Sequence, residues 1–343
     1  MKAVLFSKHG GPEVLEWADA PDPSPKPDEI LVKVLACSIN HLDIWIRQGM
    51  PAYSISLPHI SGCDVVGVVE KLGQQAGDLR QGDLVLLAPG LSCGACEWCA
   101  SGNDNLCVSY GIRGAKTDGG YAQYAVAKAK DAIPLPAGVQ PESAAAFPLV
   151  FLTAWHMLVT RAKLQEGQTV LVHAAGSGVG HAAVQIAKYC RAKVIATVGH
   201  ESKVPKAKAL GAGHVIQYKK EDVLKRVKAL TDGRGVDVVV EHIGPEVWET
   251  SIKALAKNGR LVTCGATSGP QAGLDLRYLF SRQLSVLGAM MGTRRELDLL
   301  VPLLISGVLA PVVDTVFPLK EARAAQERIL NRDIFGKFVL KVS

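Results

Sequence analysis

The strongest constraint on the fold is an alternation of apolar and amphipathic segments that begins near residue 166. Amphipathic segments with helical spacing separate five strand-like ones: TVLVHAA, KVIATV, HVIQY, VDVVVEHIG and RLVTCG. Strands that are joined through helices run parallel, because each connection has to cross from one end of the sheet to the other. The alternation therefore predicts an α/β domain with a doubly wound parallel sheet and helices on both faces.

The part of the chain before about residue 135 has a different texture. Short β-branched segments, for example at 30–35, 65–69 and 84–87, alternate with turn-rich stretches such as PDPSPKPDE, which predicts a β-rich, barrel-like domain. After a helix expected at about 294–306, strand-like pieces are expected to rejoin this domain. The predicted organisation is a first domain at 1–148, a second at 149–292, and a C-terminal segment, 293–343, that returns to the first.

The composition argues against several classes of function. The 343 residues are 48% hydrophobic, and a net charge of +6 is spread out without an arginine-rich tract of the kind that contacts nucleic acid. The N-terminal MKAVLFSKHGG reads as a strand and not as a signal peptide, and Pro148, Thr153 and His156 interrupt the longest apolar run. We expect a cytoplasmic protein with a small-molecule substrate and neither a membrane nor a nucleic-acid partner.

Four of the eight cysteines lie close together. Cys93, Cys96, Cys99 and Cys107 stand in CGACEWCASGNDNLC with two, two and seven residues between them. Thiolates at this spacing are typical of tetrahedral zinc, whereas the alternative, a disulfide framework, is typical of short secreted chains. Since four protein ligands leave no open position on the metal, we predict one structural zinc per chain, in a lobe near residues 90–110.

A glycine-rich turn, AAGSGVG, joins the strand predicted at 169–173 to a helix predicted at 181–189. At such a turn, free N–H groups and the positive end of the helix dipole bind the pyrophosphate of a dinucleotide. The spacing departs from G-x-G-x-x-G, because Ser177 stands where glycine is more common. A tight packing turn is the alternative, but the strand and helix alternation favours a coenzyme site. The residues predicted to bind the coenzyme here are Gly176, Ser177, Gly178, Val179 and Gly180.

The second strand of this region ends at Val198, where a site selective for NAD would carry a carboxylate for the ribose 2′-hydroxyl. Without that carboxylate nothing repels a 2′-phosphate, so NADP(H) is favoured over NAD(H). The residues predicted to lie beside it are His200, Lys203 and Tyr218. Two alternatives remain open: Lys203 belongs to a solvated lysine face, or Glu201 reaches the ribose.

These motifs and others resemble the medium-chain dehydrogenase/reductase superfamily, most closely its quinone oxidoreductase-like branch. Besides the cysteine lobe and the glycine turn, the resemblance rests on four segments: NHLDIWIRQG, SGCDVVGVVEKLG, DGGYAQY and AAAFPLVFLTAW. It covers nearly the whole chain and implies a GroES-like β-rich catalytic domain, a Rossmann NAD(P)-binding domain and hydride transfer in the cleft between them. It also implies a homodimer or homotetramer.

The chain differs from the zinc alcohol dehydrogenases of that superfamily at the catalytic metal. Their ligands are usually a cysteine, the histidine of Gly-His-Glu and a later cysteine or acid; the resemblance places Asn40, Cys63 and Leu149 at these positions. A catalytic zinc needs three protein ligands and one open position. We therefore expect no catalytic zinc, although Cys63 with a neighbouring histidine or acid remains an alternative site.

Hydride delivery without zinc suits a substrate that is electrophilic by itself, such as a quinone or a C=C bond conjugated to a carbonyl. By the resemblance, Asn40 and Asp43 line the cleft near the acceptor and are the candidate catalytic residues. The coenzyme contacts further expected are Thr153, Gly244, Cys264, Gly265, Met290 and Met291, although ordinary core packing explains the two methionines equally well.

Three functions compete at this stage. The first is an NADPH-dependent quinone or enone reductase, and the second is an alcohol dehydrogenase with an atypical metal site at Cys63. The third is a non-catalytic NADPH-binding sensor. His41, Tyr53 and Tyr124 are proton donors by type, but no motif singles one out and none is assigned.

Overall fold

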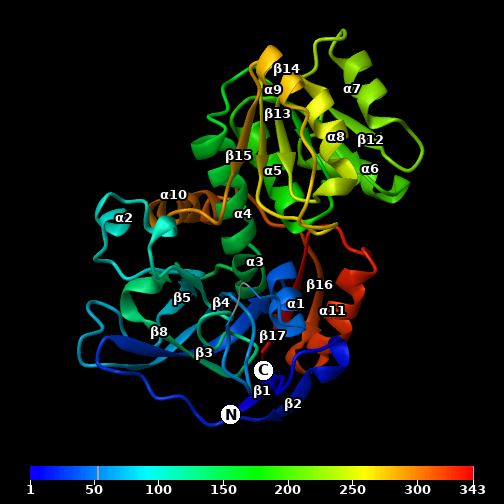
Figure 1. Cartoon of the computed structure of the whole chain (residues 1–343). Helices are drawn as coiled ribbons and strands as arrows, with labels where there is room; N and C mark the ends of the chain where they lie inside the picture. The colour runs from blue at the N-terminus through cyan, green and yellow to red at the C-terminus, as the bar shows by residue number, and fades with distance from the viewer. Residues whose placement is uncertain (52–53, 343) are drawn as a thin grey trace. The chain divides into compact units, whose positions relative to one another are not determined.

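The computed structural model describes residues 1–51 and 54–342; Tyr53, one of the three candidate proton donors, lies outside the described residues. The chain forms two compact units, residues 1–149 with 293–343, and residues 150–292. The first is rich in antiparallel strands, and the second is built on a parallel sheet (Figure 1). The predicted fold class, a β-rich domain plus a doubly wound α/β domain, is confirmed.

The first unit is organised around β3 (Glu29–Ser38), which pairs with three other strands. On one side it runs antiparallel to β4 (Asp64–Leu72). Its other side is shared: β8 (Tyr124–Lys128) lies opposite residues 29–33, and β17 (Lys337–Lys341) lies opposite residues 36–38. A strand near the C-terminus is therefore part of the same sheet as the N-terminal strands.

Further strands and helices complete the first unit. Its main sheet continues through β5 (Leu84–Leu87) and β9 (Ala132–Pro134) beyond β4, and through β16 (Val313–Pro318) beyond β17. Two small ribbons pair β1 (Lys2–Leu5) with β2 (Glu16–Asp19) and β6 (Gly90–Leu91) with β7 (Gly111–Ile112). The helices are α1 (His41–Gln48), α2 (Glu97–Ala100), α3 (Pro141–Ala145), α10 (Arg294–Ile305) and α11 (Ala322–Leu330).

The second unit is a six-stranded parallel sheet in the order β12-β11-β10-β13-β14-β15. Its strands are β10 (Thr169–Val172), β11 (Lys193–Val198), β12 (His214–Gln217), β13 (Val236–Glu241), β14 (Leu255–Thr263) and β15 (Ser285–Gly288). Its helices are α5 (Gly178–Tyr189), α6 (Val204–Leu210), α7 (Val223–Leu230), α8 (Pro245–Ala254) and α9 (Leu276–Ser281). The central strands are almost continuously buried, as expected for strands covered on both faces.

For the longest apolar run, residues 144–159, the sequence predicts one buried helix, but the structure divides the run between two helices. It ends α3, forms α4 (Pro148–Trp155) and continues into a π-helical turn, His156–Arg161. Pro148 begins a new helix because proline lacks the N–H that would continue the preceding one and is well suited to a first helical position. Within residues 1–51 and 54–342, no helix has the length and apolar character needed to span a membrane.

Candidate functional site

The glycine turn joins the carboxyl end of β10 to α5. Ser177 is the N-cap residue of α5, and its Oγ accepts a hydrogen bond from the N–H of Gly180 at 2.9 Å. Only glycine fits at position 180, because a Cβ there would lie 2.2 Å from the carbonyl oxygen of Ala174. The turn is thus held close to the end of the strand.

This turn lies where the strand order of the sheet reverses. β10 has β11 on one side and β13 on the other, an arrangement that opens a crevice outside the carboxyl ends of the strands. The first turn of α5 brings its free N–H groups and positive dipole end to that edge. The five residues predicted at 176–180 are all in this turn, and together they fit the pyrophosphate of a dinucleotide.

The end of β11 carries no carboxylate. Val198 is its last residue and is only 1% exposed. The chain then forms one 3-10 turn, Glu201–Lys203, and the ring of His200 caps it by accepting a hydrogen bond from the N–H of Ser202. Lys203 therefore lies at the end of this short turn, next to the strand end that the coenzyme's adenosine approaches in such folds.

Two side chains that follow β12 also reach this segment. Tyr218 lies against Gly199, where a Cβ would be 2.5 Å from the tyrosine hydroxyl. Lys220 Nζ lies 2.8 Å from Glu201 Oε2 and lowers the pKa of that carboxyl. Lys220 therefore pairs with Glu201, the carboxylate that one interpretation of the sequence assigned to the ribose hydroxyl of the coenzyme.

The last residue of β13, Glu241, is fully buried and organises the adjacent turn. Its Oε1 accepts hydrogen bonds from the N–H groups of Ile243 at 2.5 Å and Gly244 at 2.6 Å, and its Oε2 accepts one from Thr263 Oγ1 at 2.9 Å. Gly244 has φ 103°, a conformation that favours glycine. The carboxylate thus joins the ends of β13 and β14, where the predicted residues Gly244, Cys264 and Gly265 lie.

Three further residues assigned to the coenzyme belong to the second unit. Thr153 in α4 is buried, and its Oγ1 donates to the sulfur of Met291 at 3.9 Å. Met291 is also buried, whereas Met290 is 50% exposed. The two methionines that follow β15 therefore occupy different environments.

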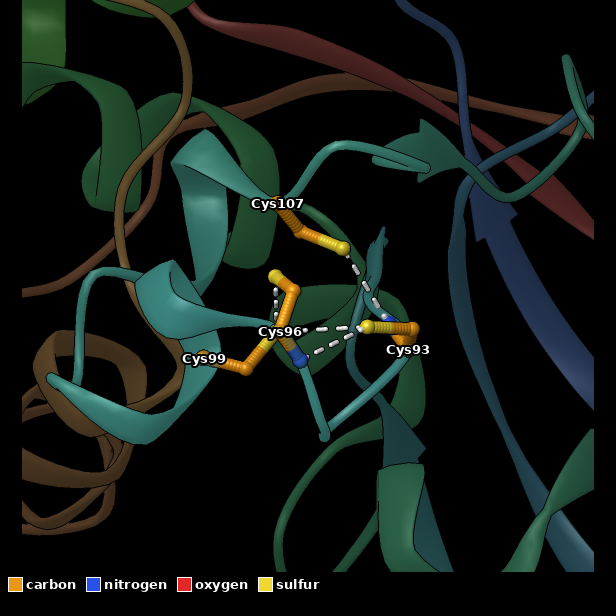
Figure 2. A group of neighbouring side chains, drawn as sticks. All are labelled: Cys93, Cys96, Cys99 and Cys107. Carbon is orange, nitrogen blue, oxygen red and sulfur yellow. Dashed lines mark hydrogen bonds between the residues drawn. The ribbon is translucent and has the colours of Figure 1, made fainter.

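The four cysteines of the lobe converge on one point (Figure 2). All four sulfurs lie within 4.8 Å of one another, and Cys99 Sγ lies 3.6 Å from Cys96 Sγ and 3.9 Å from Cys93 Sγ. Four Zn–S bonds of about 2.3 Å would hold the sulfurs of a tetrahedral site about 3.8 Å apart. The donor set therefore fits a zinc ion with four thiolate ligands.

Backbone N–H groups point at these sulfurs. Ala95 and Cys96 donate to Cys93 Sγ at 3.4 and 3.3 Å, and Cys93 donates to Cys107 Sγ at 3.3 Å. The last bond lowers the pKa of Cys107 to about 6. Such bonds stabilise thiolates, the form that binds zinc. Elsewhere in the described part of the chain, no second group of three or more cysteine, histidine or acidic side chains converges in this way.

Asn40, a candidate catalytic residue, is buried in a network centred on Asp64. Its Nδ2 donates to Asp64 Oδ2 at 2.7 Å and to Cys63 Sγ at 3.3 Å, and its Oδ1 accepts a hydrogen bond from Lys337 Nζ. Asp64 also accepts from Ser38 Oγ at 2.8 Å. Both hydrogens of the Asn40 amide are therefore used within the protein.

The Lys337 ammonium, on β17, is the counter-charge of this network. It is 2% exposed, lies 3.7 Å from Asp64 Oδ2 and donates to the carbonyl of Ile39 at 2.8 Å. The remaining carboxylate oxygen of Asp64 accepts the N–H of Leu149 at 2.9 Å. Asp64 and Lys337 are thus satisfied by each other and by their neighbours.

Asp43, the second candidate catalytic residue, is also buried and structurally engaged. Its Oδ2 accepts hydrogen bonds from the N–H of Asn40 at 2.8 Å and from Tyr121 OH at 2.9 Å, and its Oδ1 accepts the N–H of Gly62 at 3.2 Å. Burial raises the pKa of Asp43 to about 6. The carboxyl joins the start of α1 to the segment that precedes β4.

Sequence reasoning did not assign a role to Glu241, Tyr121 or Lys337. For Glu241 a signal was present, because it is a polar residue at the end of an apolar parallel strand. Lys337 gave no such signal, since it lies 297 residues from Asn40 and only the pairing of β17 with β3 brings the two together.

Comparison with known proteins identifies the family. Residues 26–137 match the alcohol dehydrogenase GroES-like domain, and residues 178–306 match the zinc-binding dehydrogenase domain. The quinone oxidoreductase of Salmonella typhimurium is 34% identical over 98% of both chains, and quinone oxidoreductase 1 of Escherichia coli is 33% identical over 98% of both. The chain belongs to the medium-chain dehydrogenase/reductase superfamily, in its quinone oxidoreductase-like branch.

Solved structures of this superfamily are similar over the whole chain. The structure of an NAD-dependent alcohol dehydrogenase is 45% identical, with a TM-score of 0.96 and complete coverage of both chains. A thermostable alcohol dehydrogenase from Pyrobaculum aerophilum, solved with cobalt and zinc, is 34% identical, with a TM-score of 0.91 over 99% of each chain. Like other members of the superfamily, this chain is an NAD(P)H-dependent oxidoreductase.

The buried ion pair makes a prediction about stability. Lys337→Met removes the counter-charge of Asp64 and a donor to Asn40, so the free energy of unfolding should fall by about 3–5 kcal/mol. Adding Asp64→Asn should recover part of this loss, because it removes the unpaired charge. Urea denaturation followed by circular dichroism measures both effects.

Lys341→Met is the matched control. Lys341 is on the same strand and pairs with Glu142 at 2.9 Å, but its side chain is 63% exposed, so its loss should cost less than about 1 kcal/mol. An equal decrease in the free energy of unfolding for the two lysine variants would show that the buried Asp64–Lys337 pair contributes no more to stability than the exposed pair.

Proposed function

We propose that this protein reduces a quinone, or a C=C bond conjugated to a carbonyl, with hydride from NADPH and without a catalytic zinc. The observation that carries the proposal is the state of Asn40 and Cys63, two of the three residues that by the resemblance stand where a zinc alcohol dehydrogenase would carry metal ligands. In this chain a buried lysine ammonium and a set of hydrogen bonds occupy them.

Asn40, Cys63 and the neighbouring Asp64 are poor metal ligands in this setting, and the third position, Leu149, has no ligating side chain. The Asn40 carbonyl oxygen accepts from Lys337, and Asp64 accepts from Ser38, Asn40 and the backbone. Burial raises the pKa of the Cys63 thiol well above its ordinary value, which keeps the sulfur protonated. A metal here would have to displace the ammonium and leave hydrogen-bonding groups unpaired, at a cost in stability.

The chemistry then rests on the coenzyme and on an acceptor that needs no Lewis acid. When bound, the nicotinamide supplies a hydride. The chain's own part is to bind the pyrophosphate at the turn from Gly176 to Gly180, to fix the strand ends through Glu241 and to position the coenzyme near Thr153 and Met291. We assign no side chain as proton donor.

The preference for NADPH is a second part of the proposal. Val198 leaves the end of β11 without a carboxylate, and Lys220 neutralises Glu201 nearby. Lys203, His200 and Tyr218 belong to the segments that follow β11 and β12. Together they supply a cation and hydrogen-bonding groups suited to a 2′-phosphate.

The four-cysteine lobe is proposed to hold a structural zinc. Its four ligands leave no position for a substrate, so the metal contributes to folding and not to hydride transfer. Cysteine ligands must remain reduced to bind zinc, which suits the cytoplasm, the location we propose.

An alcohol dehydrogenase is the second candidate function. The observation in its favour is the 45% identity to a structure described as an NAD-dependent alcohol dehydrogenase. It differs from the first candidate in the acceptor, in the coenzyme and in its need for a second metal at Cys63.

Turnover assays separate the two candidates. We expect the purified protein to oxidise NADPH in the presence of a quinone or an enone, above a blank without enzyme. NAD⁺ or NADP⁺ with a panel of primary and secondary alcohols should give no reduction. Cys63→Ala and the matched buried variant Cys37→Ala should behave alike. Alcohol oxidation that is lost in Cys63→Ala alone would establish the second candidate instead.

Lys203→Glu tests the coenzyme preference. Replacing a cation with an anion beside the 2′-phosphate should weaken NADPH binding by about tenfold or more and change NADH binding little. Fluorescence titration of both coenzymes measures this. Lys206→Glu, in the following helix, controls for a general change in surface charge. An equal loss for NADPH and NADH would contradict the assignment of Lys203.

Elemental analysis tests the structural metal. Protein purified without chelator should contain about one zinc per chain, because four thiolates form one closed site. Cys99→Ser should lower both the zinc content and the thermal midpoint, whereas Cys190→Ser, outside the lobe, should change neither. A ratio near two would indicate a second metal site, and fully folded Cys99→Ser protein that has lost hydride transfer would contradict a purely structural role.

A further inference from the structure

The residue after β13, His242, connects the end of that strand to the glycine turn. Its Nε2 lies 3.1 Å from the carbonyl oxygen of His173 and 3.4 Å from Ser177 Oγ. A carbonyl oxygen only accepts hydrogen bonds, so Nε2 carries the hydrogen of the neutral ring. The imidazole therefore donates toward both the end of β10 and the N-cap residue of α5.

These contacts determine the direction in which the Ser177 hydroxyl can donate its hydrogen. Its oxygen already accepts the N–H of Gly180 at 2.9 Å and lies within reach of the His242 donor. With donors facing its oxygen from two directions, the hydroxyl hydrogen is directed away from both, and it is available to an acceptor outside the turn. Serine in place of the more common glycine thus adds a donor to the turn.

We propose that Ser177 and His242 form a phosphate-binding pair for the coenzyme, in which Ser177 donates to the pyrophosphate and His242 takes up a proton when the dinucleotide binds. The proposal rests on nicotinamide coenzyme binding, which the family establishes, and not on the identity of the acceptor. It assigns His242 a role in coenzyme affinity and its dependence on pH.

Two of the titratable groups near His242 are kept neutral by burial. His173, at the end of β10, is held neutral: its Nε2 lies 2.9 Å from Ser251 Oγ, and burial lowers its pKa to about 3. Burial also raises the pKa of Cys264, after β14, to about 12, so that thiol stays neutral. His181 of α5 bonds to the Ser177 carbonyl through Nδ1 at 3.1 Å.

Glu241 is the anionic group next to the ring. Its carboxylate accepts hydrogen bonds from two backbone N–H groups and from Thr263. Burial lowers the pKa of His242 in spite of Glu241, which keeps the ring neutral in the free protein near neutral pH. An anionic pyrophosphate at the turn favours the imidazolium and raises this pKa.

The sign of the pH dependence follows. Since the bound form holds the proton more tightly than the free form, binding takes up protons, and affinity rises as the pH falls through the pKa of the bound form. We expect the wild-type protein to bind NADH about three- to tenfold more tightly near pH 6 than near pH 8. NADH is the probe because it lacks the 2′-phosphate of NADPH, which titrates in the same range.

The decisive measurement is calorimetric titration of NADH in buffers of different ionisation enthalpy, which counts the protons taken up. His242→Gln keeps a donor near the Nε2 position but has no titrating group. It should bind NADH with little pH dependence and without proton uptake. His214→Gln, at the exposed start of β12, is the matched control and should keep the wild-type proton uptake.

Ser177→Gly tests the other half of the pair. It restores the common glycine and removes the hydroxyl, so NADH binding should weaken by about three- to tenfold at every pH. In the double variant with His242→Gln, the fold-loss in NADH affinity should be smaller than the product of the fold-losses of the two single variants, because the two residues act on the same phosphate.

Three results would overturn the proposal. The first is wild-type protein that binds NADH without proton uptake between about pH 6 and pH 8, which needs no variant to interpret. The second is His242→Gln protein with the wild-type uptake. The third is a loss of affinity in His242→Gln that is equal at every pH, which would make His242 only a structural support of the turn. If the protein bound neither NADH nor NADPH, the result would instead contradict the coenzyme site itself.

Discussion

The first unit depends on the burial of one carboxylate, Asp64. It accepts hydrogen bonds from Ser38 at the end of β3, from Asn40 before α1 and from the backbone of Leu149, and it pairs with Lys337 on β17. A buried charge is costly unless it is paired and fully hydrogen-bonded, so these segments are constrained to meet around it. The same network also engages the side chains of Asn40 and Cys63.

In the second unit, side chains at the carboxyl edge of the parallel sheet hold the strand ends and turns together. Glu241 and His242 connect strand ends to neighbouring segments through hydrogen bonds to backbone groups, and Ser177 caps α5 through the N–H of Gly180. These bonds fix the turn in which an anion meets free N–H groups, and they also place a titratable ring beside it. Binding of a coenzyme at this edge is thus connected to the protonation of the protein.

Motifs whose chemistry lies within a few residues were the most readable from the sequence. The spacing of Cys93, Cys96, Cys99 and Cys107 predicted convergence, and their sulfurs lie within 4.8 Å of one another, because a short loop limits how far its side chains can separate. The strand, glycine turn and helix around Ser177 were predictable for the same reason. The apolar run at 144–159 was less predictable. Its hydrophobicity indicated burial, but it indicated neither the break before Pro148 nor the π-helical turn that follows α4.

The sequence by itself determined the two domain types, the convergence of the four cysteines and the glycine turn, because each rests on local periodicity or on residues close together in the chain. Only the tertiary structure decided what surrounds Asn40 and Ser177. Lys337 reaches Asn40 across 297 residues through the pairing of β17 with β3, and His242 reaches Ser177 across 65 residues through the packing of β13 beside β10. Spacing in the sequence does not encode such contacts, since they depend on the order of strands in a sheet, which is set by the packing of the whole domain.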